Sequence, residues 1–260
     1  MQELRVSSWS ELQDAVFEGA WNQNLRRYRS PFVFRGVSDV HYSLVTSLSR
    51  LGGDTRELER HLLRAFRKYA HPEIDGHDSY WYWLAAGQHH GLPTRLLDWS
   101  YSPLVAMHFA TADPRKFDCD GVIWMLDFGA TNAFLPSPLR ELIEEEGTGV
   151  FTVELLAELS RRSGGNTGSS SFDVKAIENL EAKSEQPFLL FLEPPSIDAR
   201  IAQQYALFSR CSPTRFPRST SGWRRARRCG AGSSCPPRSS GRCATSSTRP
   251  TSTSAPSSPA

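Results

Sequence analysis

A sharp change in composition near residue 210 limits what this chain of 260 residues can fold into. From Arg210 to Ala260 there are ten arginines but no lysine, aspartate or glutamate, in a background of mostly serine, proline, glycine, threonine and alanine. Such a segment offers few apolar side chains for a core. Removing its ten charges from the chain's net +2 leaves about −8 for residues 1–209. We therefore expect one folded domain over residues 1–209 and an unstructured tail over residues 210–260.

Three interpretations of the tail compete. A basic arm would bind nucleic acid through its arginines. A metal or disulfide module would use the four cysteines of the tail, but no CxxC or paired Cys/His spacing is present. In the third, the tail is GC-rich DNA read out of frame. Residues 242–255 can encode LRDKLDQANINER in the shifted frame, when third bases are chosen within the degeneracy of the code. We expect this frameshift, and we expect no nucleic-acid partner despite the arginines.

The chain as a whole has the composition of a globular protein. With 39% hydrophobic and 22% charged residues, it falls in the range of soluble domains. No apolar run reaches the roughly 20 residues that a membrane span needs. The N-terminal MQELRVSSWSEL also lacks the basic-then-apolar order of a signal peptide. We therefore expect a cytoplasmic protein with no membrane partner.

Local patterns predict helices and short strands before residue 210. Ser8 and Glu11 fit a capping box, and Asp54 or Thr55 can cap a second helix. Helices are predicted over residues 8–25, after Asp54 or Thr55 with apolar residues recurring to Tyr69, and from Tyr80 to a stop at Gly91. Further helices are predicted from Ser102-Pro103 onward, twice within 138–162, and from Asp198 to Phe208. Strands are predicted over residues 31–34, 121–128 and 187–192. This mixed order favours the α+β class, with helices around a small, mainly antiparallel sheet.

The segment from Gln88 to Thr111, QHHGLPTRLLDWSYSPLVAMHFAT, is the strongest indication of a site. It places two histidines, an arginine, an aspartate and two serines between two helix-like runs. Gly91 and Pro93 argue against a continuous core helix there. Polar side chains on a loop between regular elements are typical of binding and catalytic sites.

Arg35 and Gly36 form a second candidate, at the end of the strand predicted over residues 31–34. A glycine lets the backbone approach a ligand closely, and a guanidinium offers a planar fork that suits phosphate. An equally favoured alternative is that Arg35 pairs with a carboxylate, such as Asp39 or Asp98.

The histidines give weaker indications. His89 and His90 are adjacent, so they point in different directions and cannot both easily bind one metal. Asp98 could orient a histidine or receive Arg95, as in acid–base sites, although a satisfied structural network is the more frequent outcome. Cys119 has no second thiol near it in sequence, so we expect neither a zinc site nor a cysteine nucleophile.

Three blocks together resemble one bacterial family. PFVFRGVSDVHYSLVTSLSR, QHHGLPTRLLDWSYSPLVAMHFA and RIAQQYALF are similar to the FRG domain, which is named for its F/Y-R-G triplet. The resemblance covers roughly residues 8–209, and the middle block is its most specific part. Two positions depart from the pattern, since Tyr42 stands where a tryptophan is expected and Tyr205 interrupts a Gln-Gln-Gly-like run.

A second and weaker resemblance is to ADP-ribosyltransferases. A strand ending in aromatic-Arg-Gly is followed by a Ser-x-Ser-like element and a helix of the form xxVAxxFA. The resemblance implies that Arg35 holds the phosphates of NAD and that Ser100 or Ser102 supports the nicotinamide-ribose pocket. The late glutamate of that family has no clear counterpart. Glu193 or a non-ionised Gln203 could replace it, or it lies in the VPAE that the shifted frame gives near residues 234–238.

The sequence thus predicts a nucleotide site with ADP-ribosyltransferase-like chemistry, in a toxin or phage-defence setting. The catalytic candidates are Ser100, Ser102, Glu193 and Gln203. The ligand-binding candidates are Arg35, Gly36, His89, His90, Arg95 and Asp98. NAD is expected as a substrate, and no metal is expected. Two alternatives stay open: a non-catalytic binding module and, less favoured, a hydrolase that uses His89 or His90 with Asp98.

Overall fold

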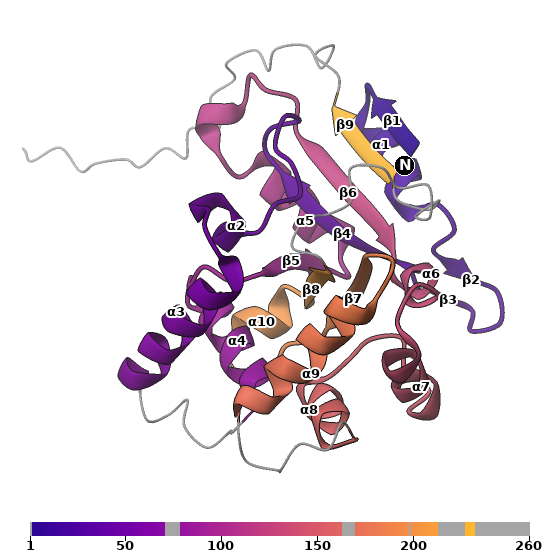
Figure 1. The fold of residues 1–260 in the computed structure, drawn as a ribbon. Coiled ribbons are helices and arrows are strands. Elements are labelled where there is room, and N and C mark those ends of the chain that lie inside the picture. Colours follow the sequence, from indigo (N-terminus) through magenta and orange to yellow (C-terminus); the bar gives the residue numbers. More distant parts are fainter. Residues whose placement is uncertain (1, 71–78, 163–169, 198, 213–226, 232–260) are drawn as a thin grey trace, which may run out of the picture.

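A seven-stranded sheet forms the centre of the molecule (Figure 1). The computed structural model describes residues 2–70, 79–162, 170–197, 199–212 and 227–231. In spatial order the strands are β1 (Gln2–Val6), β9 (Arg227–Ala231), β6 (Val122–Asp127), β4 (Phe32–Val37), β5 (Leu96–Ser100), β8 (Ala206–Ser212) and β7 (Phe188–Leu192). All neighbours are antiparallel except β1 and β9, which are parallel. The predicted α+β class with a mainly antiparallel sheet is therefore confirmed.

The two middle strands, β4 and β5, meet at one residue pair. Phe34 lies opposite Ser100, whereas β4 pairs with β6 over its whole length and β5 pairs with β8 over its whole length. The sheet therefore consists of two halves, with β1, β9, β6 and β4 on one side of this junction and β5, β8 and β7 on the other.

Each half of the sheet has its own helices on the same face (Figure 1). Helices α1 (Trp9–Phe17) and α5 (Pro103–Thr111) pack on β4 and β6 through Val16, Ala106 and Met107. The other half is covered by α3 (Thr55–Tyr69), α4 (Tyr80–His89), α7 (Ser137–Glu145), α8 (Val153–Arg162) and α9 (Ser170–Lys183). Their apolar side chains meet the alternate residues Phe188, Leu190 and Leu192 of β7.

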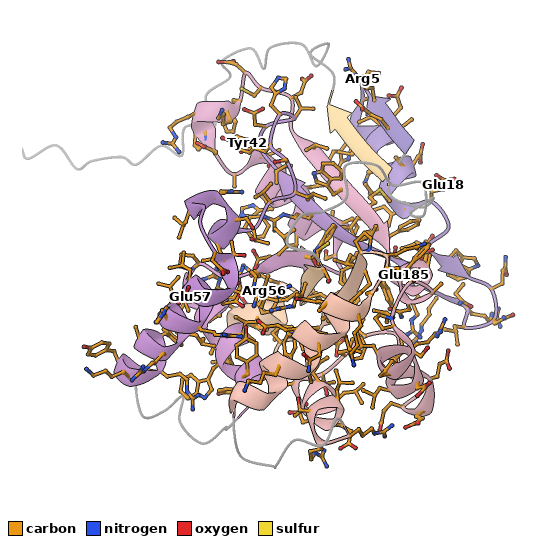
Figure 2. The ribbon with its side chains drawn as sticks, in the orientation of Figure 1. Arg5, Glu18, Tyr42, Arg56, Glu57 and Glu185 are labelled. Atoms are coloured by element: carbon orange, nitrogen blue, oxygen red, sulfur yellow. The ribbon has the colours of Figure 1, made fainter. Side chains whose placement is uncertain are left out.

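The opposite face of the sheet carries a third core. It contains Val33, Leu97, Trp99 and Leu126, and the partly buried Leu44, Tyr101 and Phe128 pack against it. The loop before α2 (Ser47–Leu51) belongs to this side, and Tyr42 in that loop lies under the Lys116 ammonium, 5.3 Å from the ring centre (Figure 2). The remaining short elements are α6 (Phe128–Asn132), α10 (Ala199–Gln203), the 3₁₀ turn η2 (Pro114–Lys116) and the hairpin of β2 (Trp21–Asn22) and β3 (Arg27–Tyr28).

Several predicted elements are confirmed. Helix α3 occupies residues 55–69, and Asp54 caps it by accepting from the backbone N–H groups of Arg56 and Glu57. Pro103 begins α5, where its missing N–H costs nothing. The strands predicted over residues 121–128 and 187–192 are β6 and β7, and the two acidic helices within residues 138–162 are α7 and α8. These elements could be predicted because their capping residues and the spacing of their apolar residues lie within the elements themselves or next to them in the sequence.

Other predictions of this kind were wrong. The first helix ends at Phe17 rather than residue 25, because the chain turns through Gly19 at φ 70°. Strand β4 continues to Val37, so Arg35 and Gly36 lie inside a strand. The segment after Gly91 was interpreted as a loop, but it contains β5. The last helix stops at Gln203, and the next residues form β8.

The predicted boundary between domain and tail falls within a strand. Residues 210–212 complete β8, and residues 227–231 form β9 between β1 and β6. The other residues of the expected tail, 213–226 and 232–260, lie outside the described residues, as does Asp198. None of the helices in the described ranges is long and apolar enough to cross a membrane.

Candidate functional site

Of the three consecutive residues Phe34, Arg35 and Gly36, the first and the last both face helix α5. Phe34 is buried against α5 and lies opposite Ser100. At Gly36 an added Cβ would lie 1.7 Å from the main-chain oxygen of Ala106, so α5 rests directly on the strand. The close approach that Gly36 permits is therefore to helix α5, whereas the sequence had suggested a ligand.

Arg35 bridges the two halves of the sheet where their ladder ends. Its Nη1 donates to the main-chain oxygen of Asp98 at 2.6 Å and lies 3.5 Å from the Asp98 carboxylate oxygen Oδ2. The guanidinium thereby satisfies a main-chain carbonyl of β5 at a position where β4 no longer pairs with that strand. Asp98 is thus the carboxylate partner that the sequence offered as an alternative. The other option, Asp39, pairs with Lys116 at 2.8 Å.

Arg35 keeps donors that no described residue uses. Its side chain is 19% exposed, and its hydrogen bonds and ion pairs within the described part of the chain all go to Asp98 through Nη1. Burial lowers the pKa of Arg35 from its usual range, the Asp98 carboxylate raises it, and the nearby Arg50 lowers it again. An arginine remains charged under such shifts, so the donors on Nε and Nη2 stay available to an anion.

A second cation and an aromatic ring lie near Arg35. Arg50, on α2, is exposed and close enough to influence Arg35 electrostatically. Trp124 is the cross-strand neighbour of Arg35 in the register of β4 and β6, so their side chains share one face of the sheet. The arrangement can therefore receive an anionic group with a flat ring beside it.

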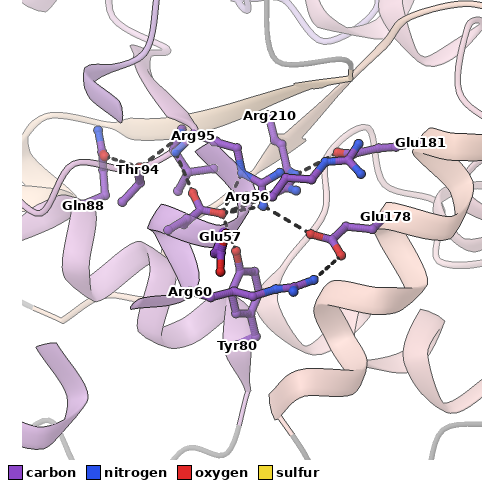
Figure 3. Close-up of polar contacts among 12 residues, drawn as sticks. Arg56, Glu57, Arg60, Tyr80, Gln88, Thr94, Arg95, Glu178, Glu181 and Arg210 are labelled. Carbon is purple, nitrogen blue, oxygen red and sulfur yellow. Dashed lines mark hydrogen bonds and ion pairs between the residues drawn. The ribbon is translucent and has the colours of Figure 1, made fainter. Parts of the chain in front are cut away.

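Asp98 is held from its other side by a relay of side chains. Its Oδ1 accepts from Gln88 Nε2 at 2.9 Å, and Gln88 Oε1 accepts from the Thr94 hydroxyl at 2.5 Å (Figure 3 shows Gln88 and Thr94). The Thr94 hydroxyl also accepts from the backbone N–H of Leu96 at 3.0 Å. Thr94 is fully buried, whereas the Asp98 side chain is 58% exposed. The buried Thr94 hydroxyl therefore holds the exposed Asp98 carboxylate in place through Gln88.

Ser100 uses its hydroxyl inside the protein. The hydroxyl donates to the main-chain oxygen of Gln204 at 2.7 Å and accepts from the backbone N–H of Ser102 at 3.0 Å. Ser100 lies opposite Phe34, the residue before Arg35 in β4. The Ser102 hydroxyl, at the start of α5, makes no hydrogen bond to a described residue.

The two candidates for a catalytic acid lie elsewhere. Glu193, just after β7, accepts from the Tyr101 hydroxyl at 2.8 Å. Burial and the Glu193 carboxylate both raise the pKa of Tyr101. Gln203 is exposed at the end of α10. No contact within the described residues joins Glu193 or Gln203 to Arg35.

The histidines are not joined to Asp98. Within the described part of the chain Asp98 binds Gln88 and Arg35, and neither histidine is among its partners. His90 ends α4, and its ring lies 6.0 Å from that of Phe66. The described residues also contain no group of three or more His, Cys, Asp or Glu side chains that could hold a metal ion.

Arg95 belongs to a buried ionic network rather than to Asp98, so that predicted pairing is wrong (Figure 3). Its Nε and Nη2 lie 2.8 and 2.7 Å from Oε2 of Glu59, a fully buried residue of α3. The same carboxylate accepts from the Tyr80 hydroxyl at 2.6 Å and faces Arg210 at 3.5 Å. Glu59 would be costly to bury without these cations, and Arg95 supplies one of them.

Sequence reasoning missed several of these residues. Gln88 and Thr94 lay inside the segment singled out as a site, and their polar side chains were a usable signal. The sequence contains no such signal for Arg50, Trp124 and Glu59, because each meets its partner only when distant parts of the chain come together.

Comparison with protein-family models gives one match. Residues 30–119 match the model of the FRG domain. This range contains β4, β5 and the residues of the relay from Thr94 to Arg35. Searches of curated proteins and of solved structures found no match.

Proposed function

We propose that the FRG domain in this chain binds a phosphate-bearing nucleotide, NAD or a related molecule, beside Arg35. One observation carries the proposal. The Arg35 guanidinium is largely buried where β4 and β5 part, and its Nε and Nη2 donors are not used by any described residue. A guanidinium matches phosphate geometry in two-point hydrogen bonding. Partial burial strengthens such an interaction, because the effective dielectric constant is lower there than in water.

The neighbours of Arg35 support a nucleotide over a simple anion. Arg50 adds a second positive charge, which suits a diphosphate. Trp124 lies on the same face as Arg35 and offers a ring on which a base could stack. NAD has both a diphosphate and two flat rings.

Binding is better supported than catalysis. ADP-ribosyl transfer by Ser100 requires its hydroxyl beside the ligand on Arg35, but that hydroxyl is bound to Gln204 and Ser102. Ser102 is the stronger serine candidate, because its hydroxyl has no partner among the described residues. A non-catalytic binding module is therefore our second candidate function, and the position of Ser100 favours it.

Ligand binding to the purified protein tests the proposal. We expect NAD and ADP-ribose to raise the melting temperature and nicotinamide, which lacks phosphate, to leave it unchanged. Arg35→Gln should weaken NAD binding by about ten-fold or more, because a charged hydrogen bond is lost. Arg64→Gln, at an exposed position of α3, is the matched control and should bind like the wild type. No response of the wild-type protein to any phosphate-bearing nucleotide would overturn the proposal.

Nicotinamide release separates the two candidate functions. A transferase incubated with NAD would release nicotinamide, and Ser102→Ala would reduce the rate. A protein that binds NAD without releasing nicotinamide would be the non-catalytic module.

A further inference from the structure

We propose that the Asp98 carboxylate competes with the ligand's phosphate for Arg35 and so lowers the affinity of the site for anions. This inference rests on the proposed function and deepens it, because it names the group that regulates the same site. A negative charge already stands beside the guanidinium that would bind the phosphate. Two negative charges sharing one cation repel each other.

The geometry separates the orientation of Arg35 from the charge of Asp98. The short contact of Arg35, 2.6 Å, goes to the main-chain oxygen of Asp98, whereas the carboxylate lies 3.5 Å away. The main-chain carbonyl stays in place whatever side chain stands at position 98. Removing the charge of Asp98 should therefore leave the guanidinium oriented as it is.

The carboxylate is also held in a position from which it can turn away. Its Oδ1 is fixed by Gln88, which is itself fixed by Thr94, and its other oxygen faces Arg35. The side chain is 58% exposed, so solvent already reaches more than half of its surface. A phosphate bound to Nε and Nη2 would repel the carboxylate that faces Nη1 and would disturb its contact with Gln88.

The alternative is that Asp98 positions Arg35 for the ligand. Removal of the Asp98 charge would then weaken binding rather than strengthen it. The two interpretations predict opposite signs for one substitution, so a single measurement decides between them.

Calorimetric titration of NAD and of pyrophosphate into the full-length protein provides that measurement. Asp98→Asn keeps the size of the side chain and an oxygen that can accept from Gln88, and it removes the charge. We expect its Kd for both probes to fall roughly five-fold, the scale of a partly exposed ion pair. Asp14→Asn, at an exposed position of α1, makes the same change in net charge and should leave Kd unchanged.

A second variant guards against loss of folding in the first. Gln88→Met keeps a similar volume and removes the bond that holds Asp98, so its Kd should lie between those of the wild type and Asp98→Asn. If the wild type binds but Asp98→Asn binds equally or less well, the inference is overturned and the proposed function stands. If neither protein binds either probe, the proposed function fails and the inference fails with it. Binding by Asp98→Asn alone would support both.

Discussion

At Gly36 the backbone of β4 lies so close to α5 that one added methyl group would meet the main-chain oxygen of Ala106 at 1.7 Å. Neither the strand nor the helix can move aside without disturbing the core that contains Phe34 and Met107. We expect Gly36→Ala to lower the free energy of unfolding by about 3 kcal/mol or more, as measured by urea denaturation. Gly129→Ala is the control, because its Cβ would meet only Asp127 Oδ1, at 3.5 Å, within a short helix. Equal stability of the two variants would contradict this account of the triplet.

Glu59 gives the protein a pH dependence of known sign. Burial would raise the pKa of Glu59, but the guanidiniums of Arg210 and Arg95 outweigh it and hold the pKa below its usual range. A carboxylate with a depressed pKa stabilises the fold fully above its unfolded pKa of about 4.3 and loses that contribution as the pH falls. We expect the free energy of unfolding to fall as the pH drops from about 5 to 3.

Two variants isolate this contribution. Glu59→Gln should be less stable at neutral pH by about 3–5 kcal/mol, because the buried Arg95 and Arg210 each lose one carboxylate partner, and should show a shallower fall in acid. Glu57→Gln, an exposed neighbour on the same helix (Figure 2), should keep the wild-type slope. An unchanged slope in Glu59→Gln would show that other carboxylates control acid unfolding.

At the scale of elements, the Ser100 hydroxyl joins the end of β5 to the start of α5 and to the turn between α10 and β8. We expect Ser100→Ala to cost about 1–3 kcal/mol, because a buried carbonyl and an N–H group lose their partner. Ser102→Ala should change stability by less than about 0.5 kcal/mol, since its hydroxyl makes no such bonds. Chemical denaturation of both variants tests this, and a larger loss in Ser102→Ala would contradict the assignment of roles.

The elements that could be predicted from sequence are those whose signals are local. Helix α3 has its cap at Asp54, one of the two predicted caps, and its apolar residues at helical spacing, so the helix itself was predicted correctly. Strand β8 was missed because RIAQQYALF begins with helix-forming residues, and its partners β5 and β7 come from elsewhere in the chain. Strand pairing depends on such tertiary context more than on local propensity.

The candidate site was predictable to a similar extent. The polar residues of the FRG-like blocks were identified, and the pairing of Arg35 with Asp98 was one of two stated options. The face on which each side chain lies could not be predicted, because it depends on β4 continuing through Arg35 to Val37. The partner of Arg95 was wrong for a related reason, since Glu59 lies on a helix that precedes it by more than thirty residues.

At the scale of the whole molecule, strand pairing beyond residue 209 limits the codons at which the reading frame could change. Arg210 is buried between Glu181 and Glu59, and β8 keeps its register with β7 through Ser212. Residues 227–231 also pair in register with β1 and β6, so we propose that the frame changes after codon 231. Sequencing the gene over codons 205–260 tests this, and a frame-corrected protein should give a higher soluble yield. An intact frame, or equal yields from the two forms, would contradict the proposal.

The single residue pair between β4 and β5 has a mechanical consequence. Within the described sheet the strands of each half pair along their length, but Phe34 and Ser100 are the one paired position between β4 and β5. If the sheet is pulled apart, we expect β4 and β5 to separate before β6 or β8 separates from its neighbour. Amide hydrogens near Ser100 that face β4 should then exchange with solvent faster than those in the middle of β6. We therefore expect the two halves of the sheet to move relative to each other more readily than strands within one half. The hydrogen bond from Arg35 to the main-chain oxygen of Asp98 would limit that movement.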